Sequence, residues 1–600
     1  MLTRRNLLSS AAGAAAISAL PAFAAPDGAD AAARAVLDDI TEEMIRTSPE
    51  TATYLGRDIG ALAPLRSQLS DRSAKGVAET VARLQRATAR LKALRRDTLS
   101  PAVSNDVRVV EAAFTTALEG FGFGYGDVAI GGYRNSPFVV IQNVGAFIDV
   151  PLFLDNEHPL KTAADADAYV ARLDAYPREL DGETARLAAD RAKGVVAPDF
   201  LVDKTIAALK LSLAGPPGEW QVIAPLAAKA ASIPGNAVTR AGRIAERAIG
   251  PALERQIAEL QRHRLKADGR AGVWKQPRGD EYYAWALAAG TTTKMSPAEV
   301  HQMGLDQMRD LQGQMAPILA GLGYTKGTVG ERLQGIAKDP RFTFPDTDAG
   351  RAEILAVMQR SVDKMARLTP RLFATQVKSN VVVRRQLLAQ EIGGAGAYGG
   401  PGTPDGRVSP TVWVNLRTPS TWSRFSLPDL AYHEGIPGHG WQGQYNFRLP
   451  LIRTMLAFNA YKEGWALYGE QLADELGVYS DSPVDRLGYL QSLAFRAGRL
   501  VVDTGLHAKR WTRDQAIRWF AENNGEARGD EVDRYCAWPG QACGYKVGHT
   551  HIVGLRERAK TALGDRFDLR LFNDALVGGG EMPLSVLDGV VAEHIRLRKA

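Results

Sequence analysis

The sequence predicts a mainly α-helical protein of two lobes, with a small antiparallel sheet directly before its chemically most distinctive helix. Apolar residues recur at helical spacing through most of the chain. β-Rich composition is confined to residues 379–416. The chain of 600 residues is long enough for several domain-sized units, which a large helical protein can pack as one two-lobed body.

Composition and charge exclude several classes of protein. Charged residues make up 23% and hydrophobic residues 45% of the chain, which is typical of a globular protein rather than a disordered or fibrous one. The net charge is only +6 and Lys/Arg runs are short, so no nucleic-acid partner is expected. Cys536 and Cys543 are the only cysteines, which excludes a cysteine-ligated zinc site; they are either a disulfide or two buried thiols.

Residues 1–24 have the features of a twin-arginine signal peptide. Arg4 and Arg5 precede an alanine-rich apolar stretch, and Ala22-Phe-Ala24 supplies a small-x-small cleavage site. An N-terminal amphipathic helix is the alternative. With a signal peptide, the twin-arginine export machinery is an expected partner. No other stretch approaches the roughly 18 apolar residues of a membrane span, so the processed protein is expected in the periplasm or secreted, outside the membrane.

Helical spacing recurs on both sides of the β-rich stretch. Residues 25–375 are expected to form an N-terminal helical lobe and residues 376–600 a catalytic lobe. The expected helical segments of the first are 27–55, 75–97, 103–119, 163–193, 199–214, 236–266, 296–321 and 348–370. Those of the second are 427–436, 449–475, 483–509, 512–522, 540–563 and 583–597.

Two segments are expected to be non-helical. Residues 120–147 carry aromatics and amides among glycines, which is typical of an irregular loop. This loop either seals the core or lines a cavity, in which case Asn135 and Gln142 would face it. In the β-rich stretch, a glycine-rich turn separates two strands, and Pro410 places the second strand at a sheet edge because proline lacks an N–H. Such an edge can pair with an extended peptide.

His433, Glu434 and His439 are close to the H-E-x-x-H zinc signature. Zinc hydrolases need three protein ligands, an open position for water and a carboxylate that takes the proton of the water. On a regular helix, a spacing of six residues turns the second histidine about 240° away from the first, so both cannot face one metal. The intervening Gly-Ile-Pro-Gly can break the helix, and we therefore expect a departure from α-helix between the two histidines.

Glu463 is the expected third ligand, on a strongly helical stretch beside Gly464, which would let another helix approach closely. A solvated helix carboxylate is the alternative. Glu470 lies two turns further on a similar face. It is either a spare ligand or a hydrogen-bond partner for a histidine.

Four motifs together resemble the bacterial domain-of-unknown-function 885 family. They are His433-Glu-Gly-Ile-Pro-Gly-His439, Glu463-Gly-Trp-Ala-Leu-Tyr468, the stretch from Arg496 to His507, and the stretch from Pro539 to Gly548. The family is regarded as related to the gluzincin metallopeptidases, such as neurolysin and angiotensin-converting enzyme. The resemblance therefore implies a helical metallopeptidase-like fold around a deep cleft, with one zinc ion held by His433, His439 and Glu463.

The resemblance also implies roles around the metal. Glu434 would activate water and then protonate the leaving amine. Tyr545 resembles in placement the tyrosine that supports the oxyanion in these relatives, although it could be an ordinary core tyrosine. His507 could donate to the substrate or oxyanion, or form a structural pair with Asp503, four residues earlier.

Other candidates have weaker support in the sequence. His549 and His551 lie two apart and would point in different directions on a helix. Arg499 and Lys546 could bind a substrate carboxylate, or form ion pairs.

The function expected from these observations is zinc-dependent hydrolysis of short peptides, of carboxypeptidase or oligopeptidase type. One alternative is a non-catalytic peptide-binding or cell-envelope protein that retains the fold. Another is a zinc amidase or esterase acting on other substrates.

Overall fold

The computed structural model confirms a mainly helical protein with one small sheet. It describes residues 28–600 except 132–133, 230–231, 378–379, 387–390, 392–395 and 403–407. The predicted signal peptide, residues 1–24, lies outside the described residues. None of the described helices combines the length and the apolar character that crossing a bilayer requires.

The helices before the sheet follow the predicted pattern closely. Residues 163–193 were expected to be helical and form α6 (Ala163–Ala192), which Thr162 and Asp165 begin with a reciprocal capping box. The others are α1 (Gly28–Arg46), α2 (Pro49–Tyr54), α3 (Ala74–Lys92), α4 (Pro101–Phe121), α5 (Ala146–Asn156), α7 (Asp199–Ser212), α8 (Ala224–Lys229), α9 (Ala237–Ile244), α10 (Gly250–Arg264), α11 (Gly279–Thr291), α12 (Pro297–Gly321), α13 (Val329–Ala337) and α14 (Asp348–Ala366).

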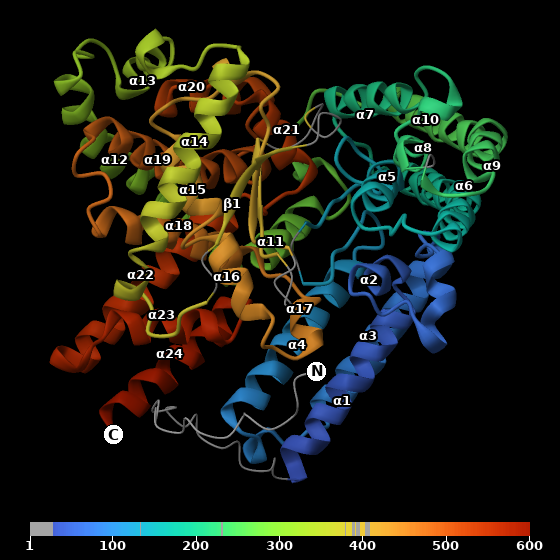
Figure 1. Ribbon diagram of the computed structural model, residues 1–600, viewed down its shortest axis with the longest axis horizontal. Helices are drawn as coiled ribbons and strands as arrows, with labels where there is room; N and C mark the ends of the chain where they lie inside the picture. The colour runs from blue at the N-terminus through green and yellow to red at the C-terminus, as the bar shows by residue number, and fades with distance from the viewer. Residues whose placement is uncertain are drawn as a thin grey trace, which may run out of the picture.

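The helices after the sheet carry the predicted chemistry. They are α15 (Leu427–Glu434), α16 (His439–Asn446), α17 (Leu451–Thr454), α18 (Asn459–Glu475), α19 (Pro483–His507), α20 (Arg513–Asn524), α21 (Gly529–Ala537), α22 (Cys543–Leu563), α23 (Leu569–Gly578) and α24 (Leu584–Lys599). In Figure 1, α5 to α10 lie at the right of the view and α12, α14, α18 and α19 at the left.

The sheet is mixed, which corrects the prediction of an antiparallel one. Its strand order is β1 (Val382–Arg385), β3 (Thr411–Val414), β2 (Ala397–Gly400). β3 is parallel to β1 and antiparallel to β2. β3 therefore lies in the centre and not at an edge. Pro410 is compatible with this position because it precedes the ladder, where its carbonyl accepts from the Val382 N–H at 2.9 Å.

Packing crosses the boundary predicted at residue 375. α12 lies along α19, and α14 packs against α15, so these helices contact the second half of the chain. A buried ion pair also joins the halves, with Arg453 Nη1 2.6 Å from Asp106 Oδ1. Buried residues from both halves form one continuous core. The division into two lobes around a deep cleft stays a prediction.

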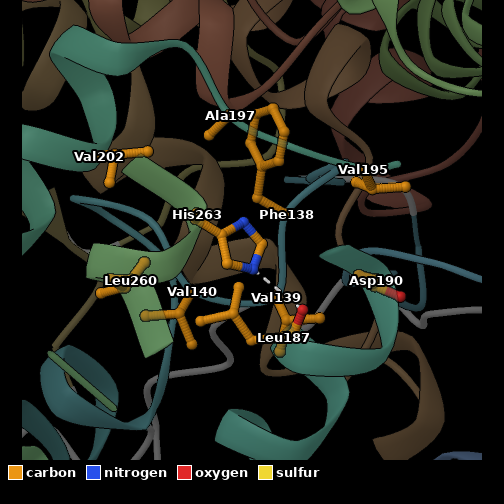
Figure 2. A pocket seen from close by; sticks show the side chains of 10 residues that line it. All are labelled: Phe138, Val139, Val140, Leu187, Asp190, Val195, Ala197, Val202, Leu260 and His263. Atoms are coloured by element: carbon orange, nitrogen blue, oxygen red, sulfur yellow. Dashed lines mark hydrogen bonds between the residues drawn. The ribbon is translucent and has the colours of Figure 1, made fainter. Parts of the chain in front are cut away.

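The loop over residues 120–147 seals the core at Asn135 and Gln142, the two residues for which a cavity-facing position was the alternative. Asn135 is buried and its Oδ1 accepts from the Ala129 N–H at 2.9 Å, while Gln142 donates to the Asp533 carbonyl at 3.3 Å. Tyr133 lies outside the described residues. Figure 2 shows the interior beneath this loop, where His263 donates to the Leu187 carbonyl at 3.1 Å among apolar side chains. That cavity, of about 10 Å³, has room for about one water molecule and is a packing void.

Helices α18 and α22 cross in close contact. A Cβ on Gly464 would lie 2.5 Å from the Gly548 carbonyl carbon, and a Cβ on Gly548 would lie 1.8 Å from the Ala460 oxygen. Neither glycine can therefore carry a side chain without separating the helices. This confirms the close approach predicted at Gly464.

We expect Gly548→Ala to destabilise the fold by on the order of 3 kcal/mol, because the new methyl group must push α22 away from α18. The matched control is Gly554→Ala on the same helix, where a Cβ would meet nothing within 4 Å. It should be neutral or stabilising by up to about 1 kcal/mol. Denaturant midpoints of the two variants test this; similar midpoints would contradict the crossing.

Candidate metal centre

The helix is interrupted between His433 and His439. α15 ends at Glu434 and α16 begins at His439, while Gly435 and Gly438 have ψ angles of −100° and −134°. A Cβ on Gly438 would lie 1.8 Å from the His433 carbonyl oxygen, so only glycine fits this position. The predicted departure from α-helix is confirmed.

The break between the two helices brings the two imidazoles together. Their ring centroids are 4.9 Å apart, at 85° to each other. Trp465 Nε1 on α18 donates to the Pro437 carbonyl at 2.9 Å, which fixes the loop to the helix that carries Glu463.

Glu463 completes a group of three potential ligands. Its Oε2 lies 3.3 Å from His439 Nε2 and 3.7 Å from His433 Nε2. One ligand atom from each of the three residues lies within 4.8 Å of the others. Bond lengths of about 2.0–2.2 Å to zinc correspond to separations of about 3.3 Å between tetrahedral ligands. The spacing and the two-nitrogen, one-oxygen donor set therefore fit an ion of this type.

Glu470 holds His433 from the other side. His433 Nδ1 donates to Glu470 Oε1 at 2.7 Å, which directs Nε2 toward Glu463. Ser492 of α19 donates to the other Glu470 oxygen at 3.2 Å, and Arg496 donates to the Ser492 hydroxyl at 2.6 Å. Of the two roles expected for Glu470, the structure supports the hydrogen-bond partner.

Buried charge surrounds the group. Burial alone would lower the pKa of His433, but hydrogen bonds to Glu463 and Glu470 raise it to about 10. Burial would raise the pKa of Glu463, but the two histidines hold it well below its ordinary value. Burial and the nearby Glu470 raise the pKa of Asp429 well above its usual range. Several carboxyl groups thus converge on two imidazoles, an environment that favours positive charge.

Glu434 lies next to the group and contacts the sheet. Its Oε2 accepts from the Gly399 N–H of β2 at 2.8 Å. A Cβ on Gly399 would lie 2.2 Å from the Glu434 carbonyl oxygen, so strand and helix approach closely here. The edge strand beside Glu434 is therefore β2, and not the strand that follows the glycine-rich turn.

His507 is not brought into this group. It is fully buried; its Nδ1 accepts from the Val273 N–H at 3.0 Å and its Nε2 donates to the Tyr535 carbonyl at 3.1 Å. Both ring nitrogens are occupied by backbone groups, so the ring has no free donor for a substrate. The expected pairing with Asp503 is also replaced, since Asp503 accepts from the Tyr283 hydroxyl at 2.7 Å and from the Gly540 N–H.

Tyr545 begins α22, the helix that crosses the Glu463 helix. Its side chain is partly exposed, its hydroxyl accepts from Arg534 at 3.4 Å, and its ring lies 4.3 Å from the Arg499 guanidinium. Its role toward an oxyanion stays a prediction.

His549 and His551 have separate partners, as their spacing predicts. His549 contacts Lys546 and Gln471, and His551 contacts Asp588. Cys536 and Cys543 are both free and buried, so the structure holds two thiols instead of a disulfide.

Sequence reasoning missed the partners that hold the group. Ser492 and Arg496 lie on α19, and Gly399 lies on β2, and no local motif marks their contacts. Arg496 stands in one of the four motifs, which is the one signal that pointed to it.

Comparisons with known proteins agree on the family and the fold. A family model described as "Bacterial protein of unknown function (DUF885)" matches residues 49–591. The solved structure of a putative lipoprotein from Colwellia psychrerythraea is 31% identical, covers 95% of this chain and 99% of its own, and has a TM-score of 0.89. A putative lipoprotein of unknown function from Shewanella oneidensis, 18% identical over 93% of this chain and 98% of its own, shares the fold with a TM-score of 0.66. No curated protein matches.

The buried His507 should make stability depend on pH. Burial lowers its pKa to about 4, against about 6.5 in an unfolded chain. As the pH falls from about 6.5 to 4, the unfolded chain takes up a proton that the folded protein does not, so stability decreases. We expect His507→Gln to remove up to about 3 kcal/mol of this decrease, as measured by denaturant unfolding at pH 7 and pH 4. An unchanged pH dependence would contradict a neutral, buried His507.

Proposed function

The chain belongs to the DUF885 family of bacterial proteins, and we propose that it is a zinc-dependent hydrolase of short peptides. One observation carries this proposal. His433, His439 and Glu463 come from three helices, yet their ligand atoms lie within 4.8 Å of one another, with Glu434 as the immediate neighbour of the first ligand. The proposal includes the relationship to gluzincin metallopeptidases and a deep cleft between two lobes.

The residues present fit a zinc site of the hydrolytic kind. His433, His439 and Glu463 would hold the ion, which when bound would polarise the scissile carbonyl and lower the pKa of a water. Glu470 keeps the proton of His433 on Nδ1, so that Nε2 is free to bind. This is the usual second partner of a ligating histidine.

Glu434 is the proposed proton carrier. Its carboxylate would accept a proton from the attacking water and return it to the leaving amine nitrogen. The Gly399 N–H holds one carboxylate oxygen in place at 2.8 Å. Tyr545 is the proposed donor to the oxyanion, because its hydroxyl is a neutral donor on the helix that crosses the Glu463 helix.

The sheet edge favours a peptide as substrate. Among the described residues β2 pairs only with β3, and the Gly399 N–H donates to Glu434 instead of to the ladder. An extended peptide that paired with this edge would run past the proposed base. A non-peptide amide or ester would gain nothing from the edge.

The cell envelope is the proposed location. The twin-arginine motif at Arg4 and Arg5 favours export, and both similar solved proteins are described as putative lipoproteins. Within the envelope, we propose that the processed protein is periplasmic or secreted.

Metal analysis tests the proposed ligands. We expect about one zinc per chain in the purified protein, and a large loss in His439→Ala and Glu463→Gln because each removes one of three ligands. Glu470→Gln should lower zinc affinity about 10- to 100-fold. His551→Ala is the matched control and should keep its zinc, because His551 contacts Asp588 instead. Zinc absent from all of these proteins would contradict the site.

Peptide cleavage tests the base. The wild type and Glu434→Gln are incubated with short peptides with free or blocked ends, and products are identified by mass spectrometry. We expect Glu434→Gln to keep its zinc and lose at least about 100-fold in rate, because it cannot accept the proton. Glu557→Gln, an exposed glutamate on α22, should behave as wild type. Zinc without cleavage of any peptide favours a binding protein or a non-peptide hydrolase, and cleavage by Glu434→Gln would refute the base.

A further inference from the structure

We propose that Arg496, Arg499 and Arg534, called here the arginine subsite, bind a carboxylate of the substrate, so that the preferred substrates are peptides with a free C-terminal carboxylate. The inference rests on the proposed peptide hydrolase function and names its substrate class. Arg496 and Arg499 lie on α19, and Arg534 lies on α21.

The arginine subsite is connected to the candidate metal centre by a short chain of hydrogen bonds. It runs from His433 to Glu470 at 2.7 Å, from Glu470 to Ser492 at 3.2 Å, and from Ser492 to Arg496 at 2.6 Å. Arg499 follows Arg496 by three residues, about 4.5 Å along the axis of the same helix. The helix that holds Glu470 through Ser492 therefore also carries two arginines of the subsite.

The subsite carries an excess of positive charge. Arg499 Nη2 and Arg534 Nη1 approach the same oxygen of Glu531, at 3.1 and 3.3 Å. One carboxylate thus serves two guanidinium groups. Arg528 also lies 3.7 Å from the other oxygen of Glu531, although its nearer partners are Glu526 and Asp530, at 3.1 and 3.3 Å. A bound monoanion would offset the remaining charge.

Buried guanidinium N–H groups remain without partners. The Arg499 side chain is only 6% exposed. Its Nε and Nη1, and Nε of Arg496, make no hydrogen bond within the described part of the chain. Unpaired buried donors on a charged group are costly. A carboxylate would supply acceptor oxygens in the paired geometry that guanidinium groups favour.

Aromatic rings hold the arginine in position next to the proposed chemistry. The Arg499 guanidinium lies 4.6 Å from the Phe495 ring and 4.3 Å from the Tyr545 ring. Contacts of this kind fix the plane of the guanidinium. Tyr545 is also the proposed oxyanion donor, and Arg534 donates to its hydroxyl at 3.4 Å. The Tyr545 side chain thus contacts the arginine subsite and would also donate to the oxyanion formed at the reacting carbonyl.

The test compares three versions of one short peptide. The first has neutral side chains and a free C-terminal carboxylate, the second is its C-terminal amide, and the third is an amide whose last residue is glutamate. Binding is measured by calorimetry on zinc-supplemented Glu434→Gln protein, and cleavage rates on the wild type. We expect the free acid to bind at least about tenfold more tightly than either amide.

Substitutions test whether the preference for the free acid depends on Arg499. In the Glu434→Gln background, Arg499→Gln should lose the tenfold preference for the free acid over the amide, while Arg499→Lys should keep part of it. Arg486→Gln, on the same helix and paired with Asp474 near the surface, is the control and should keep all of it. If Arg499→Gln fails to fold by circular dichroism, Arg534→Gln takes its place.

The outcomes separate the two proposals. Equal binding of acid and neutral amide, or no measurable binding of any version, overturns the arginine subsite even where the wild type cleaves peptides. Tight binding of the glutamate-ended amide shows that the subsite takes side-chain carboxylates and overturns the C-terminal assignment. A preference for the free acid without cleavage keeps the subsite and overturns the hydrolase function.

Discussion

The contact between the Gly438 backbone and the His433 carbonyl is the constraint on which the candidate centre depends. It permits the break after α15 that brings a histidine six residues later next to the first. The hydrogen bond from Trp465 to Pro437 then fixes this segment to α18. Because the segment between the histidines is fixed to both α15 and α18, the three potential ligands keep fixed positions relative to one another.

Charge and burial in the centre favour a cation. Glu463, Glu470 and Asp429 are withdrawn from water beside two imidazoles, and each buried carboxylate costs free energy unless positive charge or donors compensate it. Without an ion, the proton that His433 holds supplies the compensating positive charge, as the raised pKa of His433 indicates. A divalent cation would compensate the buried carboxylates more completely, since it would interact with both imidazoles and the Glu463 carboxylate at once.

Much of the fold and the centre could be predicted from the sequence where the cause is local. Helical spacing located α6, α12 and α19. The angular offset between His433 and His439, with Pro437 between them, predicted a break if both histidines face one metal. α11 was missed because the exposed positions after its first turn, 284 and 288, are alanines, so no polar face marks its period.

The contacts that remained hidden depend on tertiary structure. Pro410 suggested an edge strand, yet β3 starts one residue later and is free to pair on both sides. The family resemblance suggested chemistry at His507, but the backbone of α21 and of residue 273 occupies its nitrogens. Neither the Ser492–Glu470 bond nor the Gly399–Glu434 bond leaves a trace in local sequence, because the partners come from elements far apart in the chain.

The crossing of α18 and α22 at Gly464 and Gly548 sets the spacing of the centre by backbone contact alone. No side chain lies between the helices at that point, so the separation of Glu463 from Tyr545 does not depend on which residues pack around them. The residues that line the arginine subsite do not set this spacing. Arg496 alone is coupled to the centre, because its hydrogen bond to Ser492 continues through Glu470 to His433.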